Sequence, residues 1–182
     1  MIYGDGVRLR AVEREDIPTF VRWFNDPEVL HFILMYRPRS TADEEHWFER
    51  LADRPNDLLF AVEALIDERW VHIGNAGLHQ VDWKNSNATF GITLGEKQYW
   101  GQGYGTKTVR TVLRHAFLEL NLHRVELEVF AYNPRAIRCY EKAGFRNEGT
   151  RRESHYHEGR YHDSYRMAIL RDEFEGALSA GS

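Results

Sequence analysis

Two short segments, separated by one strand-like stretch, constrain the fold of this chain more than any other feature. The first is Trp100-Gly101-Gln102-Gly103-Tyr104-Gly105-Thr106, which runs into an amphipathic stretch ending near Leu120. The second begins with Asn133-Pro134 and ends with Gly144-Phe145. Between them, residues 124–130 alternate apolar and mostly charged side chains, which is typical of a strand. The order predicts a glycine-rich turn, a helix, a strand and a second helix that begins at proline and ends at glycine.

The glycine-rich turn has the chemistry of an anion-binding site. Glycine lets backbone N–H groups turn inward because it has no Cβ. A helix that begins directly afterwards adds unpaired amides and the positive end of its dipole, a combination that holds phosphate. The second helix presents Tyr140 from its second turn. A phosphate site beside a positioned phenol indicates group transfer from a phosphate-bearing carrier.

Two other phosphate-binding motifs fail on their spacing. A P-loop needs glycine directly before lysine, whereas Thr106 stands between Gly105 and Lys107. The dinucleotide-binding fingerprint needs a third glycine at the position that Thr106 occupies. Neither a nucleoside triphosphatase nor a dinucleotide-dependent dehydrogenase is therefore favoured.

Length and charge narrow the class further. The chain has 182 residues, enough for one domain with a full core, and its net charge of −4 argues against a dedicated nucleic-acid binder. Residues 1–96 contain 10 Lys/Arg and 17 Asp/Glu, whereas residues 97–152 contain 11 and 5. The basic excess coincides with the glycine-rich turn. It either serves an anionic ligand or is a chance imbalance on solvated faces.

Cysteine content and hydropathy indicate the cellular compartment in which the protein works. The single cysteine, Cys139, rules out an internal disulfide framework, and no nucleophile partner stands at a telling spacing from it. No basic segment followed by an apolar one opens the chain, and no apolar run approaches membrane-spanning length. We therefore expect a cytoplasmic protein with no membrane or nucleic-acid partner.

The periodicity of the rest of the chain predicts an α+β fold. Strands are expected at residues 7–12, 58–66, 70–79, 88–94 and 124–130, followed by a hairpin that turns at 158–160. Helices are expected at 18–24, 41–51, 104–120 and 134–143, the second from a capping box at 41–44. Gly91 indicates a bulge or a close approach of another backbone segment. We expect one domain over residues 1–175 and a disordered tail at 176–182.

These segments resemble the GNAT superfamily of N-acetyltransferases. The family motif Asn-x-x-Ala-x-x-x-Tyr-x-x-x-Gly-Phe is matched by Asn133, Ala136, Tyr140, Gly144 and Phe145. The glycine-rich turn matches the family's turn between its fourth strand and third helix, except that a tryptophan stands where many members have Gln or Arg. The resemblance spans residues 7–170 and implies a mixed, mostly antiparallel sheet of about seven strands flanked by helices.

The resemblance also implies an activity. It predicts an acetyl-CoA-dependent N-acetyltransferase that moves the acetyl group to a primary amine by direct attack in a ternary complex. The hairpin Glu158-Gly159-Arg160-Tyr161-His162-Asp163 is similar to the branch containing ribosomal-protein N-terminal and spermidine N-acetyltransferases. We expect a protein or peptide N-terminus as acceptor. A small amine such as spermidine, or a catalytically silent acetyl-CoA-binding module, is the alternative. A homodimer is one option for the assembly.

Three groups of residues are assigned to acetyl-CoA by the resemblance. The turn residues Gly101, Gln102, Gly103, Tyr104, Gly105 and Thr106 are expected to hold the pyrophosphate through backbone amides. The amides of Ile92, Thr93 and Leu94 are expected to hold the acetyl carbonyl. Asn133 is expected to reach the pantetheine arm, to cap the following helix, or both.

The catalytic assignments rest on one phenol and an open choice of base. Tyr140 matches the family phenol that protonates the departing thiolate, although a core tyrosine packing a helix on the sheet is the alternative. Glu96 follows the fourth predicted strand and His79 ends the third, so each is a candidate base, with Asp82 a weaker one. Surface or turn roles remain open for all three.

The acceptor site is expected along the loop after the first helix. His31, Met35, Tyr36 and Arg37 are the candidates for acceptor contact. Arg37 and Arg39 argue against a polycation, although three glutamates follow at 44, 45 and 49.

Histidines also gather in the last hairpin. His155 and His157 share a strand face and lie near His162, which permits metal binding. A solvent- or substrate-facing role is the simpler account, so we expect no metal.

Overall fold

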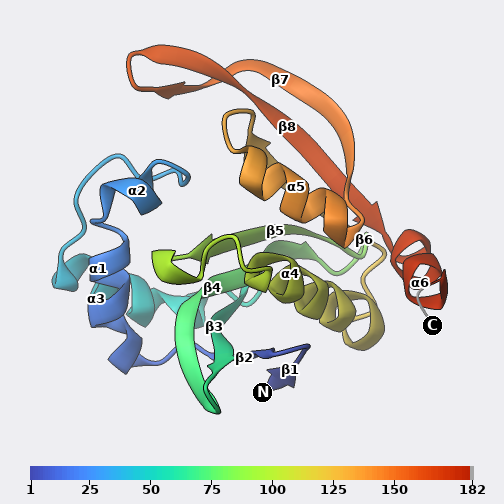
Figure 1. Ribbon diagram of the computed structural model, residues 1–182, viewed down its shortest axis with the longest axis horizontal. Helices are drawn as coiled ribbons and strands as arrows, with labels where there is room; N and C mark the ends of the chain where they lie inside the picture. The colour runs from blue at the N-terminus through green and yellow to red at the C-terminus, as the bar shows by residue number, and fades with distance from the viewer. Residues whose placement is uncertain (181–182) are drawn as a thin grey trace.

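The structure, a computed structural model, describes residues 1–180, and within them it forms one sheet of eight strands (Figure 1). The strand order is β1-β2-β3-β4-β5-β6-β8-β7. The strands are β1 (Ile2–Tyr3), β2 (Val7–Ala11), β3 (Leu58–Ile66), β4 (Arg69–Asp82), β5 (Asn87–Leu94), β6 (Arg124–Phe130), β7 (Arg146–His157) and β8 (Arg160–Leu170). The side chains of residues 177–180 are outside this description.

Helices cover both faces and the ends of this sheet. The α-helices are α1 (Ile17–Trp23), α2 (Pro27–Leu30), α3 (Thr41–Glu49), α4 (Tyr104–Arg114), α5 (Pro134–Ala143) and α6 (Arg171–Ala180). Single helical turns lie at Arg14–Asp16, Arg50–Asp53 and Lys97–Tyr99, and a π-helical segment at His115–Glu119 continues α4. Helix α4 contacts β2, β4, β5 and α5, while α1 packs against α3 at the other end of the sheet (Figure 1).

The pairing between β5 and β6 positions the site. All other neighbouring strands are antiparallel, but β5 and β6 are parallel, which requires the crossover that α4 provides. Their ladder is short: Asn87–Thr89 pair with Arg124–Glu126, and within residues 1–180 neither strand pairs with the other beyond that point. The C-terminal halves of β5 and β6 therefore diverge.

The core lies between the sheet and α4. Val109, Val112 and Leu113 lie on one face of α4 and are fully buried, as the spacing of an amphipathic helix predicts. They pack with strand residues such as Leu78 and Val125. This packing fixes the start of α4, and with it the glycine-rich turn, against the end of β5.

A buried ion-pair network joins β2 to β3 and to the start of α1. Arg10 contacts both carboxylate oxygens of Asp16 at 2.7 Å and one oxygen of Glu63 at 2.9 Å. Arg8 lies 2.5 Å from the same glutamate. Burial is the largest single influence and raises the pKa of Asp16 and of Glu63. The hydrogen bonds and positive charges around each carboxylate together outweigh it, so both pKa values lie below their usual range.

The α+β fold expected from the sequence is confirmed, with local corrections. Strand β1 was not predicted, and the predicted helix over 104–120 changes to π-helical geometry after Arg114. The capping box of α3 is formed by Ser40 and Asp43, one residue earlier than expected, because Ser40 has the extended backbone that a cap needs. Residues 176–180 continue α6 where we expected a disordered tail, and residues 181–182 lie outside the described residues.

Among the described residues, no helix combines the length and the apolar character that crossing a membrane requires.

Candidate active site

A cavity of about 680 Å³ opens where β5 and β6 diverge. Residues Phe90–Leu94 of β5 line one side, and Glu128, Val129 and Phe130 of β6 line the other. The glycine-rich turn and α5 complete the wall, and residues 32–34 reach it from the loop after α2. The two segments that dominate the sequence therefore meet at one cavity.

The glycine-rich turn forms the end of the cavity at the start of α4. Gly101 and Gly103 have φ of +76° and +88°, a left-handed conformation that favours glycine. A Cβ on either would meet no heavy atom of the described structure within 4 Å, so both face open space. Gly105 and Thr106 also line the cavity. Unpaired amides of the first helical turn at this position suit an anion.

Two of the predicted turn residues lie outside the lining. The Gln102 side chain donates a hydrogen bond to the carbonyl of Gln98 at 2.7 Å, and Tyr104 packs edge-on against Tyr99. Their backbones still belong to the turn, so their predicted contact through main-chain amides stays a prediction.

Trp100 ties the turn to the neighbouring elements. Its indole N–H donates to the carbonyl of Leu94 at 2.7 Å, and the guanidinium of Arg135 lies 3.9 Å from its ring centroid. The same guanidinium lies 5.1 Å from the ring of Phe32. The tryptophan thus links the end of β5, helix α5 and the loop after α2, which gives this departure from the family pattern a structural role.

Tyr140 lies on α5 and lines the cavity while remaining only 7% exposed. Its ring packs against Phe90 and Phe145, at centroid distances of 6.3 and 5.8 Å. Burial raises the pKa of the phenol, so the hydroxyl stays protonated at neutral pH. A protonated phenol on the cavity wall has the form that a hydrogen-bond or proton donor needs.

Cys139, the residue before it, does not have the character of a nucleophile. Burial raises the pKa of the thiol, and Thr106 donates a hydrogen bond to its sulfur at 3.5 Å. A thiol held in its protonated form is unreactive, so packing between α5 and the turn accounts for this residue.

In the cavity wall formed by β5, Gly91 has no side chain and leaves space for a neighbouring residue. Its register with β4 is regular, with Gly91 opposite Gly77, so Gly91 is not a bulge. The imidazole of His79 takes the space instead, since a Cβ on Gly91 would come within 3.3 Å of its Nε2. The close approach is made by a side chain, so neither the bulge nor the close backbone approach expected from the sequence is found at Gly91. Ile92, Thr93 and Leu94 continue this wall, and their contact with the acetyl carbonyl stays a prediction.

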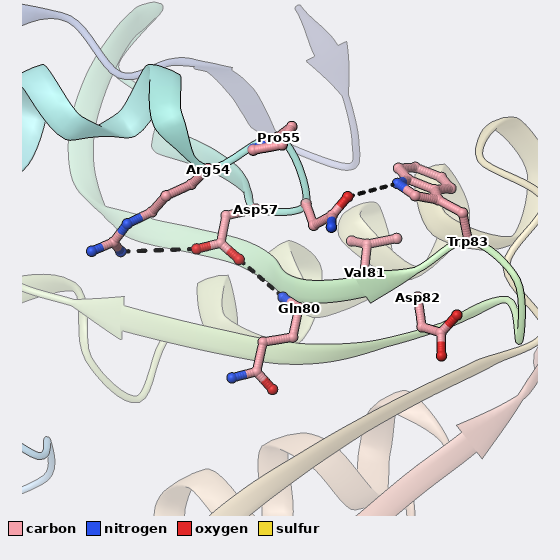
Figure 2. A pocket seen from close by; sticks show the side chains of 8 residues that line it. Arg54, Pro55, Asp57, Gln80, Val81, Asp82 and Trp83 are labelled. Carbon is pink, nitrogen blue, oxygen red and sulfur yellow. Dashed lines mark hydrogen bonds and ion pairs between the residues drawn. The ribbon is translucent and has the colours of Figure 1, made fainter.

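Of the three candidate bases, His79 is the one that lines the cavity. Its Nδ1 lies 3.7 Å from a carboxylate oxygen of Asp57. Asp57 stands in a second hollow of about 690 Å³ beneath the end of β4 (Figure 2). There it accepts a hydrogen bond from the Gln80 amide at 2.9 Å and lies 3.9 Å from Arg54. Asp57 is therefore a fixed carboxylate behind the imidazole.

Glu96 and Asp82 are engaged elsewhere. The Glu96 carboxylate is bound by Arg22 and, at 3.0 Å, by the indole of Trp23. Burial raises the pKa of Glu96, but these hydrogen bonds outweigh it and the pKa is lowered, which makes the carboxylate a weaker base. Asp82 accepts hydrogen bonds from Asn85, which also lower its pKa. Neither side chain is part of the cavity lining.

Asn133 lines the cavity and also caps α5. Its Oδ1 accepts a hydrogen bond from the Ala136 amide at 3.1 Å, so the capping alternative is confirmed. Contact with a pantetheine arm stays a prediction.

The loop after α2 approaches the cavity with different residues from those predicted. Phe32, Ile33 and Leu34 line it, whereas Tyr36 is 96% exposed and Arg37 is also exposed. Met35 is half-buried beyond the lining, and His31 is turned to the hairpin of β7 and β8, where its Nδ1 lies 2.9 Å from Nε2 of His157. The loop was predicted correctly as a wall, but its inward residues were not.

Sequence reasoning also missed the basic face of α5. Arg135, Arg138 and Lys142 line the cavity, and their spacing of three and four residues places them on one helical face. That spacing was the available signal. Lys107 and Arg110 on α4 are instead engaged by the Asp5 carboxylate at 3.2 Å and the Lys142 carbonyl at 2.7 Å.

Comparisons with known proteins agree with this geometry. The family profile described as the acetyltransferase (GNAT) domain matches residues 7–146. An uncharacterised N-acetyltransferase of the SPbeta prophage in Bacillus subtilis is 32% identical over 174 residues, which cover 94% of each chain. The spermidine N(1)-acetyltransferase of Vibrio cholerae is 30% identical over 167 residues, covering 91% of this chain and 94% of that protein.

A solved structure extends the similarity to three dimensions. The spermidine N-acetyltransferase from Vibrio cholerae in complex with CoA and spermine matches with a TM-score of 0.83 at 28% identity, covering 93% of this chain and 98% of that one. The chain belongs to the GNAT acetyltransferase family. It is an acetyl-CoA-dependent N-acetyltransferase, as the resemblance predicted.

Proposed function

We propose that the acceptor is a primary amine of a small polyamine, and that Tyr140 and His79 move the protons of the transfer. The polyamine class is favoured over a peptide N-terminus because similar proteins from Vibrio cholerae and Escherichia coli are named spermidine N-acetyltransferases. This reverses the order of the two acceptors that the sequence alone suggested. The observation that carries the proposal is the continuous cavity from the glycine-rich turn past Tyr140 to Phe32–Leu34.

The donor end of this cavity suits a nucleotide diphosphate. The turn offers backbone amides, and Arg138 and Lys142 add positive charge to the same wall. The diverging halves of β5 and β6 leave peptide groups facing one another across a space that an amide-bearing arm can occupy. In this arrangement a thioester lies beside Tyr140.

Acetyl-CoA supplies the acetyl group as a thioester. His79 accepts a proton from the ammonium form of the amine, directly or through a water, because only the neutral amine carries a lone pair for attack. Asp57 holds the imidazole from behind. Amides of β5 near Ile92 stabilise negative charge on the carbonyl oxygen. Tyr140 donates its proton as the carbon–sulfur bond breaks, and the attacking nitrogen, which becomes acidic once it is bonded to the carbonyl carbon, loses its second proton and thereby restores the phenol. The products are an amide and a free thiol.

A peptide N-terminus remains the second candidate because of the charges on the acceptor loop. Arg39 binds the buried Glu44 carboxylate at 2.6 Å, and Lys97 binds Asp26 and Glu28 at 2.8 and 2.6 Å. These carboxylates, which would attract a polycation, are thus already paired with cations of the chain, and Arg37 of the same loop is exposed.

The test is a steady-state comparison of acceptors by release of free thiol, with the product identified by mass spectrometry. Spermidine and spermine are compared with a short peptide bearing a free N-terminus and with the same peptide blocked by acetylation. We expect kcat/KM for spermidine to exceed that for the free peptide at least tenfold. A preference for the free peptide would overturn the polyamine assignment. Binding of acetyl-CoA without turnover of any acceptor would show a silent module instead.

A further inference from the structure

Three side chains with metal-binding atoms converge between helix α2 and the hairpin of β7 and β8. His31 directly follows α2, and His157 and Glu158 stand at the end of β7 and in the turn. Nδ1 of His31 lies 2.9 Å from Nε2 of His157. One oxygen of Glu158, Oε1, lies 3.6 Å from the first of these atoms and 3.7 Å from the second.

These three distances describe a nearly isosceles triangle with the dimensions of a coordination sphere. The point equidistant from its corners lies about 2.0 Å from each atom, which matches the 2.0–2.2 Å of zinc bonds to imidazole nitrogen and carboxylate oxygen. A hydrogen bond between two neutral imidazoles explains only the 2.9 Å contact between His31 and His157. It does not explain why the same carboxylate oxygen approaches both nitrogens that form the contact.

The surroundings hold the three groups in place. The ring of Tyr132 stacks on His157 at 5.3 Å and meets His31 edge-on at 5.3 Å. Nε2 of His162 lies 3.3 Å from the backbone carbonyl of His157. Both central residues of the turn, Glu158 and Gly159, have positive φ, as in a tight hairpin turn, which places the backbone of Glu158 beside His157. The Tyr132 hydroxyl is buried and has no hydrogen-bond partner among the described residues.

We infer that His31, His157 and Glu158 form a binding site for one divalent transition-metal ion of the zinc class. Two imidazoles and one carboxylate suit zinc and its substitutes cobalt and nickel better than calcium or magnesium, which prefer oxygen ligands. Three protein ligands leave a fourth position for water. The expectation from the sequence that no metal binds is thereby replaced for this site.

A metal here joins two segments far apart in the chain. His31 immediately precedes Phe32, Ile33 and Leu34, which line the cavity. The hairpin is anchored through β8 to β6, whose residues line the opposite side. Metal binding therefore fixes the loop after α2 against the hairpin and restrains the acceptor end of the cavity.

The test is zinc titration of chelator-treated full-length protein by calorimetry, with cobalt absorption as a second readout. We expect one ion per chain and the intense visible bands of four-coordinate cobalt. His157→Ala and His31→Gln should each weaken zinc binding at least tenfold, and Glu158→Gln should weaken it less. His46→Ala and His123→Ala, which replace exposed histidines elsewhere, should bind like the wild type.

Thermal unfolding and hydrogen exchange distinguish a variant that no longer binds zinc from one that no longer folds. Each variant is compared with the wild type by thermal unfolding in chelator, and one that melts within a few degrees of it is folded. Zinc should raise the wild-type Tm but not that of folded His157→Ala or His31→Gln. Zinc should also slow hydrogen exchange in residues 29–36 and 153–162. Zinc binding that survives both histidine substitutions shows an adventitious ion only and overturns the inference, as does wild-type protein that binds no zinc.

Discussion

Replacing Gly103 by alanine tests the role of the glycine-rich turn, and the structure allows the loss of folding stability to be calculated. Gly103 has φ of +88°, and an added Cβ would meet no described heavy atom within 4 Å, so the cost comes from the backbone and not from a clash. An L-residue in the left-handed region costs about 1–2 kcal/mol, of which roughly 0.4–1 is offset by the stiffer unfolded chain. We expect a net loss of about 1 kcal/mol and a fall in Tm of about 2–4 °C.

The effect on acetyl-CoA should be much larger than this stability loss implies. The new methyl group stands in the cavity end that we assign to the diphosphate, where backbone amides must approach closely. We expect KM for acetyl-CoA to rise about tenfold or more, equivalent to about 1.4 kcal/mol of binding free energy. The assay is thiol release at saturating amine with varied acetyl-CoA, beside thermal unfolding of the same samples.

Gly159→Ala is the matched control. Gly159 has φ of +82° and equally open surroundings, but it lies in the turn between β7 and β8. It should lose similar stability while leaving KM for acetyl-CoA unchanged, with chelator present in both assays. The reasoning is refuted if Gly103→Ala keeps the wild-type KM, or if both variants raise KM equally, which would assign the effect to general destabilisation.

Three further changes have defined outcomes. Tyr140→Phe keeps the buried ring and removes only the hydroxyl, so kcat should fall about 10²- to 10⁴-fold while the Kd for acetyl-CoA stays within about twofold of the wild-type value. An unchanged kcat would show that Tyr140 is not the proton donor. His79→Gln should lower kcat much more than Glu96→Gln, because His79 lines the cavity and Glu96 is bound to α1. Steady-state rates of the two variants with one acceptor test this, and the opposite order would make Glu96 the better candidate for the base. The folded-state pKa of Asp16 is below its unfolded value, so its stabilising contribution is complete above the unfolded value, about pH 4, and is lost as the pH falls through the folded one. Urea unfolding should therefore show stability falling steeply on acidification in the wild type and less steeply in Arg10→Gln, and parallel curves would contradict this account.

Local rules predicted the backbone of the glycine-rich turn and the bounds of α5 well. The glycines needed positive φ, Asn133 needed an acceptor position at the start of a helix, and Gly144 ends α5 with φ of +104°. Each of these depends on a few neighbouring residues, so the sequence alone carries the information. The alternation of 124–130 likewise marked β6 because a strand buried on one face needs that period.

The loop after α2 depends on contacts between distant segments, and its residues that line the cavity differ from those expected to contact the acceptor. The side chain of Asn25 accepts a hydrogen bond from the Arg39 amide at 3.0 Å and donates one to its carbonyl at 2.7 Å. This contact ties the end of the loop after α2 to the residues that follow α1, a link between positions 14 residues apart. Glu96 was expected beside the acetyl group because it follows β5, but Arg22 and Trp23 of α1 bind it. No local pattern encodes either choice.

The short parallel ladder between β5 and β6 decides which donors the protein can distinguish. Beyond Thr89 and Glu126, the described strands keep main-chain polar groups on facing edges that no neighbouring strand completes. A bound donor with amide groups at suitable intervals takes the place of a missing strand. A donor with a hydrocarbon arm leaves the peptide groups on those edges hydrogen-bonded to solvent. Selectivity therefore extends to the middle of the donor, and a thioester on a short, amide-free thiol should be a poor substrate even though its reacting bond is the same.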